Sequence, residues 1–204
     1  MPAYRDIICR CFKAFSSSLL LVSLVPSLAH AGSEEAVRST DDLGFLLGEW
    51  SVKRVYQPGT ENERSLSGEL SCEKALSDQF VECLFLFERP ERPPIRDNVF
   101  FNFNPIYGVY ESLWLSATWP IKVLMSAEPV DPSENFIWRA DFLIEDGVRE
   151  WVRSEWFRCE DGGFLRRTEI RTSRDPEGQW LHWMNERSTP AGINTRSQTL
   201  QECN

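Results

Sequence analysis

The chemistry open to this chain is limited first by its two histidines, His30 and His182. A Ser-His-Asp or Cys-His arrangement needs an imidazole as its general base, and the sequence holds no Gly-x-Ser-x-Gly nucleophile elbow. His182 lies between Trp180 and Trp183, where we expect a packed or hydrogen-bonded structural histidine. A single haem ligand is the alternative for this residue. We therefore expect no catalytic residue of the nucleophilic type and no cofactor other than that haem.

The sequence gives little support for a metal site, because structural zinc takes about four Cys or His ligands at short spacing and no EF-hand loop occurs.

Catalysis by paired carboxylates is harder to exclude. Glu150, Glu155 and Glu169 lie on neighbouring expected strands, and glycosidases need only two carboxyl groups about 5–9.5 Å apart. Arginines lie among these residues, so cross-strand ion pairs explain the same pattern.

Arginine and tryptophan are concentrated in the last third of the chain. The arginines there include Arg139, Arg153, Arg158, Arg166, Arg167 and Arg171. Arginine offers two parallel donors to a carboxylate or phosphate, and tryptophan offers a flat stacking face. Core packing and surface ion pairs explain this composition without function; a cavity for an anionic, partly apolar ligand also explains it. For that cavity we expect a lining of Trp50, Arg139, Arg166 and His182.

The start of the chain predicts a cleaved signal peptide over residues 1–31. Arg5, Arg10 and Lys13 precede an apolar run, and small residues end the segment at Ala31. This is the layout of a secretory signal, and the apolar run is shorter than the roughly 20 residues of a membrane span. We therefore expect a periplasmic or secreted protein with no membrane anchor after cleavage.

The chain left after cleavage suits a flexible start over residues 32–39 and a single domain over 40–204. It carries 19 basic and 30 acidic residues, a net charge of −11, against −9 for the full chain. A nucleic-acid partner is not expected, because contacts to phosphates need clustered Lys and Arg.

Four cysteines remain after cleavage, and in an oxidising compartment they predict two disulfides with three possible connectivities. A turn at Ser77-Asp78 would place Cys72 directly opposite Cys83 across a hairpin. Opposed strand residues lie about 4.5–5.5 Å apart at Cα, which is within disulfide range. Cys159 would then pair with Cys203.

From Trp50 onward the sequence predicts short strands separated by turns. Every connection is too short for a parallel crossover, so consecutive strands should pair antiparallel, and closure into a barrel removes the exposed edges. The fold class is therefore an all-β, antiparallel up-and-down barrel. Its expected strands are 49–57, 64–75, 80–89, 97–104, 109–118, 121–129, 135–145, 148–159, 164–173 and 179–187.

Local signals complete this prediction. Ser39 or Thr40 can cap a short helix that ends at Gly48. Three prolines between Arg89 and Pro94 predict a loop. Asp146-Gly147 predicts a two-residue hairpin turn, which would set Trp151 opposite Phe142.

The segment Leu43-Gly44-Phe45-Leu46-Leu47-Gly48-Glu49-Trp50 resembles the opening of the calycin superfamily, where a short helix leads into Gly-x-Trp on the first strand. The chain is most similar to bacterial secreted lipocalin-like domains of unknown function. Those often carry a cysteine pair about ten residues apart in an early hairpin, as Cys72 and Cys83 do, and an aromatic-rich middle hairpin, as in 100–110. The resemblance covers about residues 40–190 and implies a lipocalin-like barrel with an internal cavity, but no reaction.

These observations favour an exported, non-enzymatic barrel that binds a small amphipathic or anionic ligand. One alternative is an envelope interaction or inhibitor protein whose barrel is filled with side chains, which a lumen under roughly 300 Å³ would favour. A hydrolase that uses carboxylates alone is the second alternative.

Overall fold

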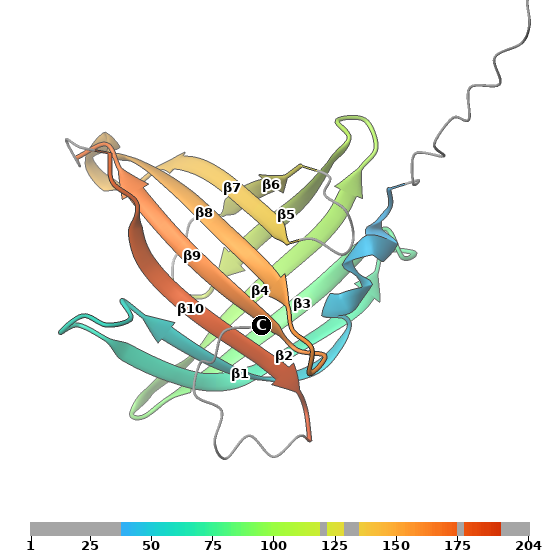
Figure 1. Ribbon diagram of the computed structural model, residues 1–204, viewed down its shortest axis with the longest axis horizontal. Coiled ribbons are helices and arrows are strands. Elements are labelled where there is room, and N and C mark those ends of the chain that lie inside the picture. Colours follow the sequence, from blue (N-terminus) through green and yellow to red (C-terminus); the bar gives the residue numbers. More distant parts are fainter. Residues whose placement is uncertain (1–37, 119–121, 129–134, 175–177, 193–204) are drawn as a thin grey trace, which may run out of the picture. The chain divides into compact units, whose positions relative to one another are not determined.

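The strands of this chain pair antiparallel and close into a barrel, as the sequence predicts (Figure 1). The computed structural model describes residues 38–118, 122–128, 135–174 and 178–192. Around the barrel each strand pairs with its neighbours in the chain, and β1 pairs with β10 to complete the circle. The strands are β1 Gly48–Tyr56, β2 Arg64–Ala75, β3 Phe80–Arg89, β4 Arg92–Asn104, β5 Val109–Ser116, β6 Val123–Ala127, β7 Phe136–Leu143, β8 Arg149–Arg158, β9 Phe164–Thr172 and β10 Leu181–Pro190.

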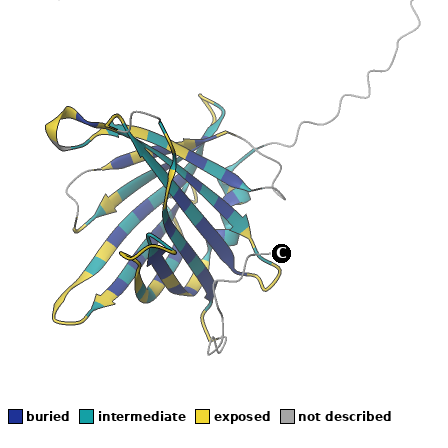
Figure 2. Ribbon diagram, turned by 60° about the vertical axis from the view of Figure 1, so that its left-hand side comes forward, coloured by how far each residue is buried: buried dark blue, intermediate teal, exposed yellow. Residues whose placement is uncertain are grey.

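Side chains alternate between the barrel interior and the outer surface along these strands (Figure 2). On β3 the inward positions are Val81, Cys83, Phe85 and Phe87, all buried, and the residues between them are partly exposed. This period of two is what a half-buried strand requires. The same alternation determines which residues of the remaining strands can line the interior.

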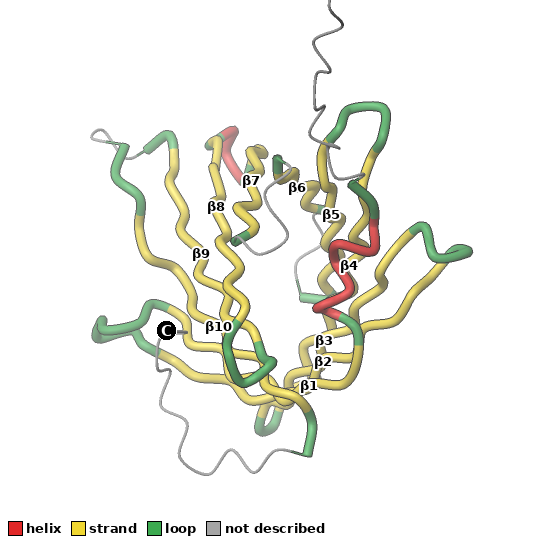
Figure 3. Tube along the Cα trace, turned by 45° about the vertical axis from the view of Figure 1, so that its right-hand side comes forward, coloured by secondary structure: helices red, strands yellow, loops and turns green. Residues whose placement is uncertain are grey.

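A short 3₁₀ helix, η1 (Thr40–Leu46), covers one end of the barrel next to β3 and β4 (Figure 3). Ser39 caps it, accepting from the backbone N–H of Asp41 while the Asp42 side chain accepts from the N–H of Ser39. The helix ends at Leu46, two residues before Gly48, which already begins β1. The expected short N-terminal helix is thus present, with its end slightly earlier than predicted.

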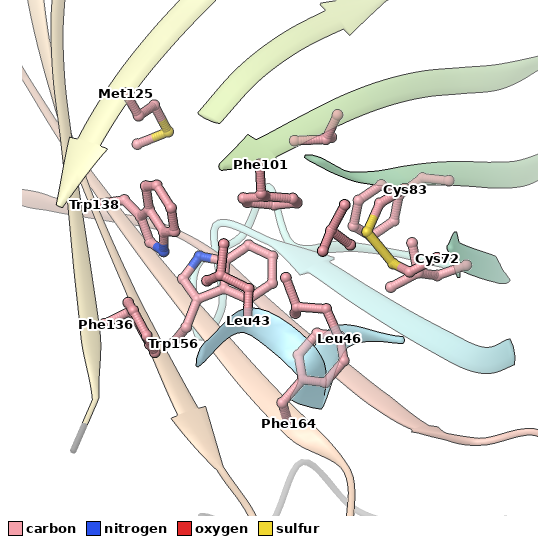
Figure 4. Close-up of a cluster of buried hydrophobic side chains, with 14 of the residues drawn as sticks. Leu43, Leu46, Cys72, Cys83, Phe101, Met125, Phe136, Trp138, Trp156 and Phe164 are labelled. Carbon is pink, nitrogen blue, oxygen red and sulfur yellow. A yellow bond between two sulfur atoms is a disulfide. The ribbon is translucent and has the colours of Figure 1, made fainter. Parts of the chain in front are cut away.

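The hydrophobic core fills the end of the barrel that η1 covers (Figure 4). Leu43 and Leu46 of η1 are fully buried and belong to the same cluster as Trp138 and Trp156. Trp50 joins this core: its indole Nε1 donates to the backbone oxygen of Leu46 at 2.8 Å. Each buried side chain of this size contributes roughly 1.5–3 kcal/mol, so the core both seals this end and ties η1 to the strands.

Two local predictions about the hairpins are wrong. The turn after β7 has three residues, Glu145–Gly147, so Trp151 pairs with Asp141 rather than Phe142. That one-residue shift places Trp151 on the outer face. The loop predicted over Arg89–Pro94 is only the two-residue turn Pro90-Glu91, because β4 begins at Arg92, which pairs with Arg89, and so includes Pro93 and Pro94. Prolines are tolerated here beside a register irregularity at the hairpin end, where few ladder donors are needed.

One disulfide is confirmed. Cys72 and Cys83 are directly opposed across the β2–β3 hairpin with Cα atoms 4.1 Å apart, and their sulfur atoms are bonded. For the second expected pair, Cys159 is disulfide-bonded, whereas Cys203 lies outside the described residues. The signal peptide (1–31) and the expected flexible segment up to residue 37 also lie outside them.

We expect the double variant Cys72→Ser/Cys83→Ser to lose about 3 kcal/mol of unfolding free energy, the entropic value for a closed loop of this length. Urea unfolding of both proteins measures the difference. Reduction of the wild type also breaks the disulfide of Cys159, so its loss should be at least as large. A difference below about 1 kcal/mol would show that this bond adds little to the barrel.

A candidate ligand cavity with a buried ion cluster

A cavity of about 270 Å³ lies inside the barrel at the end away from η1. Its lining comes from the starts of β4, β6, β8 and β10 and from the later parts of β1, β5, β7 and β9. The lining residues are Arg54, Tyr56, Ile95, Asp97, Trp114, Ser116, Thr118, Val123, Met125, Phe142, Glu150, Val152, Ser154, Arg166, Thr168, Ile170, Trp183 and Met184. Nine of these residues are apolar and nine carry charged or hydroxyl groups, so the cavity offers both apolar walls and polar groups to a small molecule.

Four charged residues meet between this cavity and the hydrophobic core, and we call them the ion cluster: Arg54, Asp97, Arg166 and Glu186. Glu186 Oε2 accepts from Arg54 Nε and, at 3.2 Å, from Arg166 Nη2. Arg54 Nη1 reaches Asp97 Oδ2 at 3.3 Å on the far side of the lumen. All four are buried, and Glu186 is the member that does not line the cavity.

Strand pairing explains why these groups meet. Arg54 on β1 is directly opposite Glu186 on β10, and Glu186 is directly opposite Arg166 on β9. Side chains at opposed positions project from the same face of a sheet, so one carboxylate stands between two guanidinium groups. Asp97 lies three strands away on β4, and the long Arg54 side chain spans that distance.

Aromatic rings pack against the guanidinium groups of both Arg54 and Arg166. The Arg54 guanidinium carbon lies 4.0 Å from the centre of the Phe87 ring, and that of Arg166 lies 4.5 Å from the Trp114 ring. Such cation–π contacts gain strength when water is excluded. Gly68 makes room for this arrangement, because a Cβ there would lie 2.7 Å from Phe87 Cδ1 and 2.3 Å from the backbone oxygen of Leu86.

The ion cluster is incompletely hydrogen-bonded. Eight buried side-chain atoms in the described part of the chain have no hydrogen-bond partner, and six of these belong to inward-facing residues. The six are Arg54 Nη2, Asp97 Oδ1, Ser112 Oγ, Arg166 Nε, Glu186 Oε1 and Ser188 Oγ. Buried polar groups normally have partners, since an unpaired one costs about 1–3 kcal/mol. Three of the six atoms belong to residues that line the cavity, namely Arg54, Asp97 and Arg166, and each of these atoms is itself buried.

The two guanidinium groups respond differently to burial. Burial lowers the pKa of Arg54, but the nearby carboxylate of Glu186, the Tyr56 hydroxyl and Asp97 together raise it above its ordinary value. Burial lowers the pKa of Arg166 to about 10, since the attraction of Glu186 only partly offsets burial and the repulsion of Arg54. Both groups therefore stay charged at neutral pH.

The structure places one of the four expected lining residues, Arg166, in the cavity wall. Trp50 lies in the core below it, Arg139 is exposed on the outer face of β7, and His182 is exposed with its Nε2 2.7 Å from Asn185 Oδ1. The expectation that these last three line the lumen is wrong, because their side chains point into the core or outward. His182 does not line this cavity.

The other arginines expected near a ligand pair on the outer surface. Arg153 bonds Glu169, and its guanidinium carbon lies 5.1 Å from the Trp180 ring centre. Arg171 lies 4.5 Å from the ring centre of Trp151. Surface ion pairs and packing therefore account for most of the Arg- and Trp-rich pattern.

Carboxylates at the cavity are fewer than the sequence suggested. Of Glu150, Glu155 and Glu169, only Glu150 lines the cavity; Glu169 pairs with Arg153 on the outer face.

Within the described residues no group of three or more His, Cys, Asp or Glu side chains could hold a metal ion. No helix of the described ranges is long and apolar enough to cross a membrane.

Sequence reasoning missed Arg54, Asp97 and Glu186. Arg54 shares its strand parity with Trp50 and Val52, both buried, and this signal could have placed it inside the barrel. Glu186 could have been found only from the closing pair β1–β10, which depends on contacts 132 residues apart in sequence.

Comparison with known proteins adds no family and no function to the description of this site. No protein-family model matches the chain, and no match to a curated protein was found. The cavity and its residues therefore carry the functional argument by themselves.

We expect Glu186→Gln to lower the unfolding free energy by about 3–5 kcal/mol, because two buried guanidinium groups would lose the charge between them. Thermal and urea unfolding measure this. Glu169→Gln, which breaks an ion pair on the outer face of the same sheet, is the matched control and should cost less than about 1 kcal/mol. Equal losses in the two variants would show that the ion cluster is not a stability determinant.

Glu150, a residue of the cavity wall, makes the stability of the folded protein depend on pH. Burial raises the pKa of Glu150 above its ordinary value, so the folded chain holds this proton more tightly and stability falls as pH rises through that raised value. Glu150→Gln should therefore be more stable than wild type at pH 7, by less than about 1 kcal/mol because the group is partly exposed. The gain should vanish near pH 4. Melting temperatures at both pH values test this, with Glu155→Gln as control, and a less stable Glu150→Gln at pH 7 would contradict it.

Proposed function

We propose that this protein is an exported, non-enzymatic binding protein that holds a small amphipathic molecule in the cavity of its barrel. The observation that carries the proposal is the cavity inside the barrel, whose wall combines apolar side chains with charged and hydroxyl groups, among them Arg54, Asp97 and Arg166 of the ion cluster. Apolar walls suit a hydrocarbon or aromatic portion, and the ion cluster supplies partners for a polar end.

Export is supported by two features. Residues 1–31 have the sequence layout of a secretory signal, and the Cys72–Cys83 disulfide is typical of proteins in oxidising compartments. The Gly48-x-Trp50 opening after a short helix, together with the closed antiparallel barrel, supports a calycin-like relationship.

The cavity volume by itself favours the alternative, an interaction or inhibitor protein. At about 270 Å³ it falls just under the roughly 300 Å³ at the lower end of small-molecule pockets. An interaction or inhibitor protein with a largely filled barrel would show such a volume. The two readings differ in what the purified protein contains.

Native mass spectrometry of the protein purified from the periplasm is the deciding measurement. We expect a compound bound at one per chain, released on denaturation and identifiable by its mass. The intact mass should also be lower by four hydrogens, as two disulfides require.

A matched pair of variants on β6 controls this experiment. Val123 lines the cavity and the next residue, Leu124, is exposed on the outer face. Val123→Trp should abolish the bound compound by filling the cavity, whereas Leu124→Trp should retain it. An empty wild-type protein, or a compound retained equally by both variants, would reject ligand carriage and favour the interaction protein.

A further inference from the structure

Among the described residues, Glu150 is the charged group of the cavity wall that has no opposite charge beside it. We infer that the cavity selects a cationic ligand, an organic amine whose ammonium group binds the Glu150 carboxylate and whose apolar body lies deeper in the barrel. This inference rests on the proposed function and narrows it to a ligand class.

The charges around the cavity do not cancel completely. In the ion cluster Arg54 pairs with Asp97 and Glu186, and Arg166 pairs with Glu186, so its two positive and two negative charges balance. Glu150 is the remaining charged residue of the lining, and it adds one negative charge. The ion cluster therefore does not select the charge of a ligand, whereas Glu150 does.

The Glu150 carboxylate has no partner in the described part of the chain. Glu150 is directly opposite Phe142 of β7 and Thr172 of β9, and no described side chain forms a hydrogen bond or an ion pair with it. Burial alone accounts for the raised pKa of Glu150. A cation bound at this carboxylate would offset that burial.

The pairs of β8 with β9 show how a ligand would lie. From Glu150 toward the core, the inward-facing pairs are, in order, Val152–Ile170, Ser154–Thr168 and Trp156–Arg166. The first pair is apolar and suits a hydrocarbon or aromatic body, and the hydroxyl groups of the second pair bond each other at 3.0 Å. Six residues of β8, about 20 Å of extended chain, separate Glu150 from the level of Arg166. An ammonium group at Glu150 therefore stays apart from that guanidinium.

Aromatic side chains of the cavity wall also favour a cation. Phe142 is directly opposite Glu150, and Tyr56 and Trp183 line the same cavity with their ring centres 5.9 Å apart. The face of an aromatic ring attracts a cation electrostatically. A carboxylate ligand would instead meet the like charge of Glu150 and the negative faces of these rings, and a neutral ligand would leave Glu150 unpaired.

The test is a series of three ligands that share one tail: 3-phenylpropylamine, 3-phenylpropanamide and 3-phenylpropanoate at neutral pH. Calorimetry and tryptophan fluorescence measure their affinities for the mature wild-type protein, freed of bound compound by denaturation and refolding with its disulfides intact. We expect the amine to bind at least about tenfold more tightly than the other two, the usual value of a hydrogen bond to a charged group. An amide or carboxylate that binds as well as the amine would overturn the inference and leave the cavity's binding role intact.

Variants at Glu150 test the reason for the preference. Glu150→Gln should weaken amine binding by at least about tenfold and leave amide binding unchanged, and Glu150→Lys should make the carboxylate the tighter ligand. Glu155→Gln, on the outer face of the same strand, is the matched control and should keep the wild-type order. Unchanged amine affinity in Glu150→Gln would contradict the role of this carboxylate. Should Glu150→Lys fail to fold, Glu150→Gln and the wild-type order still decide.

The outcomes also separate this inference from the proposed function. If none of the three ligands binds but a compound co-purifies, the charge of that compound decides: a cation supports the inference, and a neutral or anionic compound overturns it. If none binds and none co-purifies, the proposed function fails and the inference with it.

Discussion

The pairing of β1 with β10 is the contact on which the rest of the molecule depends. It joins the first and last strands of the barrel, removes two sheet edges, and brings Arg54 directly opposite Glu186. Without that register the interior would hold isolated charges that no apolar neighbour could compensate. Barrel closure and the pairing of the buried charges therefore depend on the same β1–β10 register. The barrel must close in the register that brings the opposite charges of its interior together.

A buried ion cluster is a poor way to gain stability, because desolvating each charge costs several kcal/mol before pairing recovers any of it. Well-packed apolar residues would serve a purely structural barrel better, as they do at the end that η1 covers. The chain instead places four charges and several hydroxyl groups at mid-barrel and leaves space beyond them. This division, with a sealed apolar end and an open polar floor, is easier to explain by binding than by folding.

The sequence was sufficient for the features that depend on local signals. Turn residues and period-two alternation predicted the antiparallel barrel, and one hairpin register predicted the Cys72–Cys83 pair. The cavity lining was predicted poorly, since parity divides a strand into two faces without saying which one is inward. Arg139 and Arg166 show the consequence: they lie on β7 and β9, on either side of β8, yet the first is exposed and the second is buried. Only the closed barrel distinguishes them.

The inward placement of Arg54 and Arg166 also changes what an arginine-rich sequence means here. Arginines on the outer face bind carboxylates and stack on tryptophan in water, where each pair contributes little. Inside the barrel the same chemistry is desolvated, so charge balance becomes a strict condition on anything that enters. Composition alone suggested an anion site, because it counts arginines and not the carboxylates that face them. Asp97 and Glu186 already pair with both arginines, so the number of arginines overstates the net positive charge of the interior.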